Sequence, residues 1–448
     1  MLRTAMTVLP AQLAIEPLPG SFNVTIADLP GSKSLTNRAL LLSTLAHGMS
    51  TLTNVLFSDD TRVMMTALEK LGFQLKIDEM NRIVQVNGHA GTIPTPHAKL
   101  HLGNAGTAYR FLTAACSLGK GTYTLDGYPR MHKRPVGQLV DALRQLGARI
   151  KYLGADGYPP LGVTSARLSG GEVIVPQALS SQYISALLQI AAYCDQQTIL
   201  ELQGTVTSRP YVAMTLGLIR RFGVEAQVQD NFKRITISPS TYRATDYAIE
   251  PDASNASYFL AAAATVPGGK CTIGGLGKSS LQGDIGFADL LQQMGADMLF
   301  GKDFITVMAP PETGQLRGID VDLNHMPDMA QTLAVVALFA RGATVIRNVG
   351  NLRIKETDRL AALQKELTKL GAVVAIEGDD LFITPPPDGR IKSAAIDTYD
   401  DHRMAMSFAV AALRAPGIII RQPGCVSKTF PGFFGYLDRL RDAPAVTD

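Results

Sequence analysis

Basic and hydroxyl residues stand together at several points where the sequence predicts that a helix begins. Clear examples are Gly31-Ser32-Lys33-Ser34, Thr207-Ser208-Arg209 and Ser427-Lys428-Thr429. The N-terminus of a helix binds anions through its exposed N–H groups and its positive dipole end, and Lys, Arg and Ser add further hydrogen bonds to an anion. These positions therefore predict binding of phosphate or carboxylate groups.

Helix capping explains part of this pattern. For any single Ser, Thr or Asp before a helix, an N-cap is the simpler interpretation. A basic side chain at the same place opposes the helix dipole, at a cost of roughly a few tenths of a kcal/mol. That cost recurs at Lys33, Arg134, Arg209, Lys355, Arg403 and Lys428. Because capping does not account for the whole set, the set favours anion binding.

The helices that would carry these residues recur along the chain. A phrase of the form Leu-x-x-Leu-Gly returns about every 75 residues, and its copies end at Gly72, Gly147, Gly223, Gly295 and Gly371, with a degenerate sixth copy at Leu437–Leu440. Each glycine follows an apolar i, i+3 pattern, which predicts a helix closed by a left-handed residue.

A second helix, rich in Ala and Leu, recurs with a similar period. Its copies begin near Ser34, Gly106, Ser181, Ser254, Asp328 and His402. Short β-like runs lie between the helices, at Glu172–Pro176, Arg234–Ser238, Ile305–Met308 and Leu381–Thr384. Each repeat thus holds two helices and several strands, which predicts an α/β fold with helices packed on sheets.

Six repeats of this length are too long for an ordinary solenoid and favour two domains of three repeats. The least regular connections are Ala27–Ser32 and Ala248–Ala253. We therefore predict one domain over residues 31–250 and a second over 1–30 plus 251–448.

The composition argues against nucleic-acid-binding, metal-binding and membrane-spanning proteins. The 448-residue chain has 42 Lys+Arg against 39 Asp+Glu, a net charge of +3, which is low for a dedicated nucleic-acid-binding protein. Its four cysteines lie far apart, and its histidines show no metal-ligand spacing. No run of apolar residues is long enough to cross a membrane. We expect no metal, no nucleic acid, no membrane and a cytoplasmic location.

At the predicted helix entrances the sequence resembles the 5-enolpyruvylshikimate-3-phosphate synthases, a family of enolpyruvyl transferases. The motifs that carry the resemblance are Leu29-Pro30-Gly31-Ser32-Lys33-Ser34 with Asn37-Arg38, Leu102-Gly103-Asn104-Ala105-Gly106-Thr107-Ala108, Arg134-Pro135, Ser180-Ser181-Gln182, Gln282-Gly283-Asp284, Asn324-His325-Met326-Pro327-Asp328, Ile354-Lys355-Glu356-Thr357-Asp358-Arg359, Asp401-His402-Arg403-Met404-Ala405-Met406 and Ser427-Lys428-Thr429-Phe430-Pro431. They span essentially the whole chain.

The resemblance implies two similar domains, each of three βαβαββ repeats with pseudo-threefold symmetry (an inside-out α/β barrel), with the active site in the cleft between them. It also implies transfer of the enolpyruvyl group of phosphoenolpyruvate to the 5-hydroxyl of shikimate 3-phosphate, through a tetrahedral intermediate and without a cofactor. A monomer is the family expectation.

The resemblance also implies the substrate contacts. Shikimate 3-phosphate would meet Lys33, Ser34, Arg38, Ser180, Ser181, Gln182, Ser208, Tyr211, Asp328, Asn351 and Lys355. Phosphoenolpyruvate would meet Lys33, Gly106, Arg134, Gln182, Arg359, Arg403 and Lys428. The reaction needs general acids and bases on both reacting atoms. We assign Asp328 to the hydroxyl and Glu356 to the methylene carbon, with Lys33 and Lys428 as cationic partners.

One departure from the family concerns inhibition by glyphosate. Gly106 leaves room beside the expected phosphoenolpyruvate site and favours sensitivity. Phe111 stands where sensitive relatives usually carry a proline, and we expect it to alter the entrance of that helix.

Two alternatives remain from the sequence. The first is the related transferase that acts on UDP-N-acetylglucosamine, but its family typically has a reactive cysteine near the position of Arg134, and residues 122–134 contain none. The second is a non-catalytic, polyanion-binding repeat protein. Asp328 and Glu356 among the cations argue against it, because a phosphate-backbone binder avoids acidic residues at its contacts.

Overall fold

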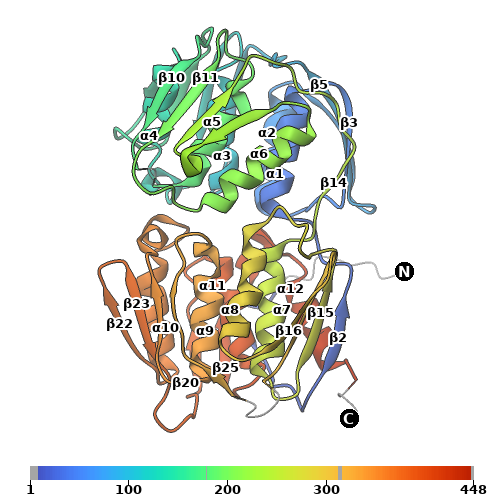
Figure 1. Cartoon of the computed structure of the whole chain (residues 1–448), viewed down its shortest axis with the longest axis vertical. Coiled ribbons are helices and arrows are strands. Elements are labelled where there is room, and N and C mark those ends of the chain that lie inside the picture. The colour runs from blue at the N-terminus through green and yellow to red at the C-terminus, as the bar shows by residue number, and fades with distance from the viewer. Residues whose placement is uncertain (1–8, 178, 311–314, 445–448) are drawn as a thin grey trace. The chain divides into compact units, whose positions relative to one another are not determined.

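The chain forms two compact units, shown in the computed structural model of Figure 1. The inserted unit is Gly31–Glu250, and the host unit combines Met1–Pro30 with Pro251–Asp448. The structure describes residues 9–177, 179–310 and 315–444. Residues 1–8 of the predicted second domain therefore lie outside the described residues. The inserted unit is continuous in sequence and interrupts the host unit.

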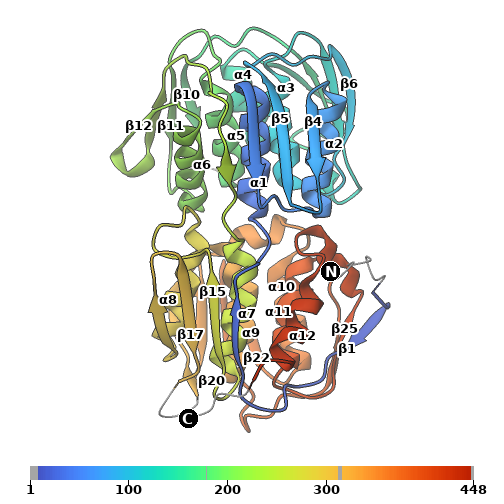
Figure 2. The ribbon, with the colours of Figure 1, turned by 90° about the vertical axis from the view of Figure 1, so that its right-hand side faces the viewer.

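Two kinds of helix build the inserted unit. The interior helices are α1 (Lys33–Leu45), α3 (Gly106–Cys116) and α5 (Ser181–Ala191). Every residue of α3 is buried, in keeping with its run of small and apolar side chains. The outer helices α2 (Asp59–Lys70), α4 (Gly137–Gln145) and α6 (Arg209–Arg221) each bury one apolar face and expose charged residues. The sheets lie around these helices in Figures 1 and 2.

Three four-stranded sheets of the inserted unit share one pairing pattern. Their orders are β14 (Tyr247–Ala248), β3 (His47–Thr53), β5 (Ile83–His89), β4 (Gln74–Asp78); then β6 (His97–His101), β7 (Thr122–Asp126), β9 (Leu161–Thr164), β8 (Arg149–Tyr152); and β10 (Gly171–Val175), β11 (Thr198–Leu202), β13 (Arg234–Ile237), β12 (Ala226–Gln229). In each sheet the first pair is parallel and the other pairs are antiparallel. This is the pairing of the predicted βαβαββ repeat. In the second and third sheets a helix, α3 or α5, connects the parallel strands, whereas in the first sheet β14 comes from the end of the unit.

The host unit repeats the pattern twice. Its sheets run β2 (Asn23–Ile26), β15 (Lys270–Gly274), β17 (Phe304–Met308), β16 (Asp297–Phe300), and β19 (Asp320–Asp322), β21 (Thr344–Arg347), β23 (Asp380–Thr384), β22 (Val373–Glu377). Its interior helices are α7 (Ala253–Thr265), α9 (Ala330–Val336) and α11 (His402–Ala412). Its outer helices are α8 (Phe287–Gln293), α10 (Arg359–Lys369) and α12 (Phe433–Arg441).

The interior helices of the host unit meet along a line of hydroxyl groups. Ser257 Oγ lies 3.3 Å from Thr332 Oγ1, which lies 3.4 Å from Ser407 Oγ. The three residues come from α7, α9 and α11 at equal spacing in the sequence, and all are buried. Equivalent positions of three repeats therefore face one another, as pseudo-threefold packing requires.

The sixth repeat differs from the other five. It contains β24 (Ala394–Ile396) parallel to β25 (Ile418–Arg421), followed by α12. The antiparallel partner of β25 is β1 (Gln12–Ala14), from the start of the described chain. The degenerate copy predicted at Leu437–Leu440 thus lies in a real helix, but its sheet is completed from the other end of the sequence.

The predicted helix ends are confirmed. The glycines that close the first family of helices all have positive φ, between 83° and 108°, at Gly72, Gly147, Gly223, Gly295 and Gly371. A side chain at such a residue is strained, so glycine is favoured. These turns lead each outer helix directly into a strand.

Candidate active site

The entrance of α1 holds Lys33 and Ser34 at its first two positions. Ser32 is the N-cap, and its Oγ accepts a hydrogen bond from the N–H of Leu35 (3.4 Å). Lys33 Nζ lies 3.7 Å from Asp60 Oδ2, a carboxylate in the first turn of α2 that is almost fully buried. The predicted cation therefore lies against a carboxylate that is not among the predicted site residues.

Arg38, one turn further along α1, lies 2% exposed. Its Nε donates to Thr215 Oγ1 (2.7 Å), and Nη2 donates to Ser185 Oγ (3.1 Å). Burial lowers the pKa of the guanidinium to about 10. The same guanidinium donates to the backbone oxygens of Ser34 (2.9 Å) and Tyr211 (3.4 Å). Arg38 thus joins α1, α5 and α6, and its described contacts are those of a residue that positions these helix entrances.

The entrance of α3 brings two buried guanidinium groups to Gly106. A Cβ at this position would lie 2.6 Å from both Arg110 Nη1 and Arg134 Nη2. Arg134 Nη1 donates to the backbone oxygen (3.0 Å) and side-chain oxygen (3.1 Å) of Asn104. Burial, followed by repulsion from Arg134, lowers the pKa of Arg110 to about 10. Two adjacent cations at a helix entrance are suited to bind an anion.

Arg110 was missed as a candidate site residue. Its donors also contact protein, with Nη1 bonded to the backbone oxygen of Gly106 (3.0 Å) and Nη2 to that of Pro135 (3.1 Å). The available signal was a charged residue inside an otherwise apolar helix, which is uncommon unless the charge has partners or a function.

The entrances of α5 and α6 complete the predicted set in the inserted unit. Ser180 is the N-cap of α5, and Gln182 Nε2 donates to Thr107 Oγ1 on α3 (3.3 Å). Ser208, the N-cap of α6, has φ 54°, and its backbone oxygen accepts from the N–H of Tyr211 (3.0 Å). The first turns of α1, α3, α5 and α6 are therefore linked at one end of the unit.

In the host unit, Arg359 is the centre of an ionic cluster. It is the first residue of α10, and its side chain is 2% exposed. Its Nε lies 2.7 Å from Asp401 Oδ2, and Nη2 lies 2.9 Å from Glu356 Oε2. Burial alone lowers the pKa of Arg359, but Asp401, Glu356 and Asp328 together raise it above its usual value. The guanidinium is therefore held charged.

Asp328 lies against three cations. Its Oδ2 is 2.8 Å from Arg403 Nη2, and its Oδ1 is 3.3 Å from Arg359 Nη1 and 3.7 Å from Lys355 Nζ. The residue stands in a short 3-10 helix, Pro327–Met329, that leads into α9. This carboxylate keeps partial access to solvent, with its side chain 19% exposed. Together with Glu356, the structure thus brings five of the predicted residues into one cluster.

Arg403 is oriented by two further groups. Its backbone N–H donates to Asp401 Oδ1 (2.9 Å), the N-cap of α11, and its Nη1 donates to the Tyr258 hydroxyl (3.4 Å). Burial raises the pKa of Tyr258 to about 12, so the phenol stays protonated near neutral pH. Asp401 belongs to one of the motifs that carry the resemblance but is not among the predicted site residues, because the sequence does not show which cations a carboxylate will contact.

Lys428 and Asn351 also lie in short 3-10 helices of the host unit. Lys428 is the last residue of Pro423–Lys428 and is 9% exposed. Asn351 lies in Gly350–Ile354, and its Oδ1 is buried with no hydrogen-bond partner among the described residues. An unsatisfied buried amide oxygen is costly and is suited to accept from a ligand hydroxyl.

The four cysteines are free thiols, and three of them are buried. Burial raises the pKa of Cys116 well above its usual value and raises that of Cys425 to about 12. Neither thiol is a reactive thiolate near neutral pH. Among residues 9–177, 179–310 and 315–444, no group of three or more His, Cys, Asp or Glu side chains is arranged to hold a metal ion. Within the same ranges, no helix is long and apolar enough to span a membrane.

Paired units of βαβαββ repeats, with cations at the helix entrances and carboxylates among them, define an α/β enzyme for anionic substrates. The family model of EPSP synthase (3-phosphoshikimate 1-carboxyvinyltransferase) matches residues 19–437. The chain belongs to this family.

Relatives of known name agree with the family match. A 3-phosphoshikimate 1-carboxyvinyltransferase of Shewanella halifaxensis is 47% identical over 434 residues, covering 96% of this chain and 99% of the relative. The enzyme of the same name from Shewanella denitrificans is 48% identical over 435 residues, with the same coverage of 96% and 99%. A solved structure of EPSP synthase from Acinetobacter baumannii superimposes with a TM-score of 0.79 at 26% identity, covering 96% of this chain and 98% of that one.

Proposed function

We propose that the protein transfers the enolpyruvyl group of phosphoenolpyruvate to the 5-hydroxyl of shikimate 3-phosphate and releases inorganic phosphate. The observation that carries this proposal is the position of Asp328 against Arg403, Arg359 and Lys355, at 2.8, 3.3 and 3.7 Å. Such a cluster can hold anionic groups beside a carboxylate that accepts a proton. The relatives' names support the acceptor and the transferred group.

The anionic groups of the two substrates repel one another and need converging cations. For shikimate 3-phosphate we assign Lys33, Ser34, Arg38, Ser180, Ser181, Gln182, Ser208, Tyr211, Asp328, Asn351 and Lys355. For phosphoenolpyruvate we assign Lys33, Gly106, Arg134, Gln182, Arg359, Arg403 and Lys428. The support for these lists is that most of their members stand at or within one turn of a helix entrance or in the ionic cluster. Lys428 and Asn351 stand instead in short 3-10 helices.

The chemistry requires two proton transfers. In the addition step, the oxygen of the 5-hydroxyl bonds to C2 of phosphoenolpyruvate, and Asp328 accepts the proton that this hydroxyl loses. Glu356 delivers a proton to the methylene carbon, which gives a tetrahedral intermediate that carries a methyl group. In the elimination step the methyl group returns a proton, the double bond re-forms and phosphate leaves. Lys33 and Lys428 stabilise the negative charge that develops on the phosphate.

Arg359 links the two carboxylates in this scheme. Glu356 Oε2 lies 2.9 Å from its Nη2, and Asp328 Oδ1 lies 3.3 Å from its Nη1. The guanidinium of Arg359 thus contacts both groups that exchange protons with the substrates, and it fixes their positions relative to one another within the host unit.

Phosphate release from phosphoenolpyruvate tests the proposal. It is measured with shikimate 3-phosphate and, in parallel, with UDP-N-acetylglucosamine as acceptor. We expect release with shikimate 3-phosphate alone. Release with the sugar nucleotide alone would contradict the proposal and favour the related transferase. Silence with both acceptors, in protein whose cooperative unfolding shows that it is folded, would also contradict it.

We further propose that the protein acts in the cytoplasm as a monomer. The free thiols support a reducing compartment, because disulfides form readily only in oxidising ones. A sedimentation experiment on the purified protein tests the oligomeric state, and a dimer at working concentration would contradict the second part.

A further inference from the structure

The host unit contains a cavity that the proposed reaction does not use. Its volume is about 640 Å³. It is bounded by the 3-10 helix Ala337–Phe339 that follows α9, by β20 (Ala340–Arg341), by the loop after β23 and by the segment after α11. In Figure 1 this region lies at the lower edge of the unit, around β20. The volume is within the usual range for small-molecule sites, about 300 to 1,000 Å³.

The walls of the cavity combine positive charge with apolar surface. Three arginines line it, Arg341, Arg390 and Arg414. None of the described lining residues is acidic. The apolar part comes from Leu338, Phe339, Ile391 and three successive prolines, Pro385–Pro387. An unbalanced group of guanidiniums beside apolar walls suits a ligand with an anionic end and an apolar body.

Helix capping accounts for one of the three arginines. Arg414 Nη1 donates to the backbone oxygen of Thr265, the last residue of α7 (2.8 Å), and its guanidinium lies 4.9 Å from the centre of the Phe339 ring. A cation at a helix C-terminus is stabilising in this way. The same explanation does not apply to Arg390, which lies in a loop. Among the described residues, neither Arg390 nor Arg341 makes a side-chain hydrogen bond or ion pair.

We propose that this cavity binds a small aromatic carboxylate. Its carboxylate would pair with the guanidinium groups of Arg341 and Arg390, which present parallel N–H donors suited to bidentate contacts. Its ring would pack against Phe339 and the prolines, where apolar area is removed from water. Arg414 would remain a structural residue with its charge facing the same space.

This site is separate from the ionic cluster. Asp328 and Arg403 stand at the starts of α9 and α11, whereas Phe339 and Arg414 follow the ends of these two helices. At 1.5 Å per residue, the 11 residues of α11 span about 16 Å. A ligand in the cavity therefore does not occupy the place of phosphoenolpyruvate or shikimate 3-phosphate.

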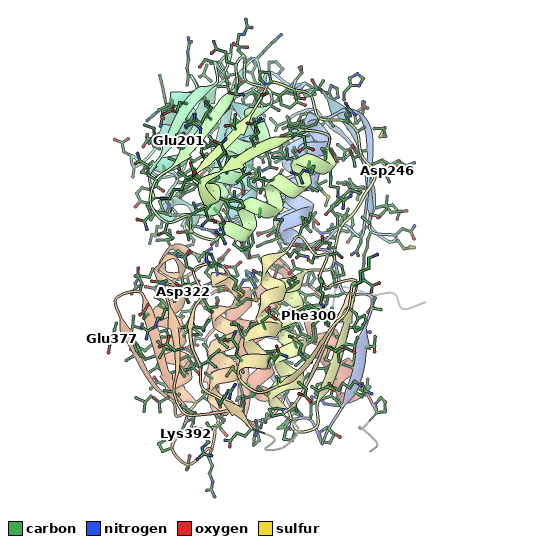
Figure 3. All side chains as sticks on the ribbon, viewed as in Figure 1. Glu201, Asp246, Phe300, Asp322, Glu377 and Lys392 are labelled. Carbon is green, nitrogen blue, oxygen red and sulfur yellow. The ribbon has the colours of Figure 1, made fainter. Side chains whose placement is uncertain are left out.

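Calorimetric titration of the full-length protein with 2-naphthoate tests the proposal. The control ligand is 2-naphthamide, which has the same ring system but an uncharged amide in place of the carboxylate. The test variant is R341Q/R390Q, in which both exposed side chains are changed. The control variant is Lys392→Gln, because Lys392 lies in the same loop, at the lower edge in Figure 3, but does not line the cavity. Turnover and the unfolding midpoint of both variants are measured first, and we expect both to match those of the unmodified protein.

We expect 2-naphthoate to bind with a dissociation constant below about 1 mM, and the double variant to weaken binding by at least about tenfold. Lys392→Gln should leave binding unchanged, and saturating phosphoenolpyruvate should not compete. The proposal is overturned if 2-naphthamide binds as tightly as 2-naphthoate. It is also overturned if the double variant binds normally, if phosphoenolpyruvate displaces the ligand or if no binding occurs up to about 5 mM.

Discussion

Replacing Gly106 by Ala should displace the two guanidinium groups at the entrance of α3. The new Cβ would lie 2.6 Å from Arg110 Nη1 and Arg134 Nη2, and 2.8 Å from Arg134 Cζ. Favourable contacts between heavy atoms begin at about 3.5 Å, so the groups must move by about 1 Å. Arg134 cannot move freely, because its Nη1 donates to both oxygens of Asn104. A displacement of this size at a reacting site can cost about 100-fold in rate.

We therefore expect the KM for phosphoenolpyruvate to rise by about ten- to hundredfold in Gly106→Ala, equivalent to about 1.4 to 2.8 kcal/mol. Steady-state phosphate release with each substrate varied in turn measures this. The KM for shikimate 3-phosphate should change much less. Gly435→Ala is the matched control, because Gly435 also lies in a helix and a Cβ there meets nothing within 4 Å. An unchanged KM for phosphoenolpyruvate in Gly106→Ala would refute the assignment of this entrance to that substrate.

The remaining predictions concern the ionic cluster, the support for Arg38, acid stability and inhibition. Asp328→Ala should lower kcat by about 100-fold or more while leaving substrate binding largely intact, and the exposed-site variant Asp438→Ala should leave both unchanged in the same kinetic assay. Thr215→Val removes the acceptor of Arg38 Nε and should reduce the free energy of unfolding by about 1 to 3 kcal/mol; a urea titration that shows no loss would mean that this buried contact is not needed. Lys369, and then Arg421, hold the pKa of the Asp397 carboxyl below its usual 3.8, so its stabilising effect is present above about pH 4 and is lost as the pH falls through the lower value. Asp397→Asn should thus lower stability at pH 7, by less than about 1 kcal/mol because the ion pair is partly exposed to solvent, and have less effect near pH 3. Glyphosate should inhibit competitively with phosphoenolpyruvate, and an inhibition constant in the millimolar range would contradict the role given to the glycine at the entrance of α3.

Local sequence patterns predicted the repeated elements because those patterns have local physical causes. Gly72 and its counterparts mark helix ends by their positive φ, and the Ala-rich helices indicate burial by lacking a polar face. The effect of Phe111 on the entrance of α3 could not be predicted from a local pattern, because the surroundings of its ring include a residue of another helix. The helix α3 is regular from Gly106 to Cys116, and the buried Phe111 ring lies 5.2 Å from the guanidinium carbon of Arg38.

Strand pairing between distant segments could not be predicted in this way. Strand β2 directly precedes α1 in the sequence yet pairs with β15 of the host unit, and β14 precedes α7 yet pairs with β3 of the inserted unit. Strand β1 completes the sixth sheet from the other end of the chain. Backbone hydrogen bonds carry little information about side-chain identity, so only the folded chain shows these partners.

The same distinction applies to the candidate site. The cations were visible because a basic residue at a helix N-terminus opposes the dipole, and that conflict can be read from the sequence. Asp60 and Asp401 could not be identified, because an acidic residue in the first turn of a helix, or at its N-cap, is ordinary. Their function follows from contacts across the fold, with Lys33 at 3.7 Å and with Arg359 at 2.7 Å.

The charged residues around the proposed site differ in their balance of positive and negative charge between the two units. In the inserted unit, Lys33, Arg38, Arg110 and Arg134 stand with the single carboxylate Asp60 in the set, and two of these guanidinium groups lie beside Gly106. That excess of positive charge favours binding of anions.

In the host unit the cluster is balanced, because Lys355, Arg359 and Arg403 are matched by Asp328, Glu356 and Asp401. A balanced cluster attracts an anion less strongly than an excess of positive charge does, although Arg359 and Arg403 can still hold anionic groups. It keeps its carboxylates in fixed hydrogen bonds, where proton transfer needs them. Charge-removing variants of the inserted unit should therefore act mainly on KM, whereas carboxylate variants of the host unit should act mainly on kcat. The opposite distribution would show that anion binding and proton transfer are not separated in this way.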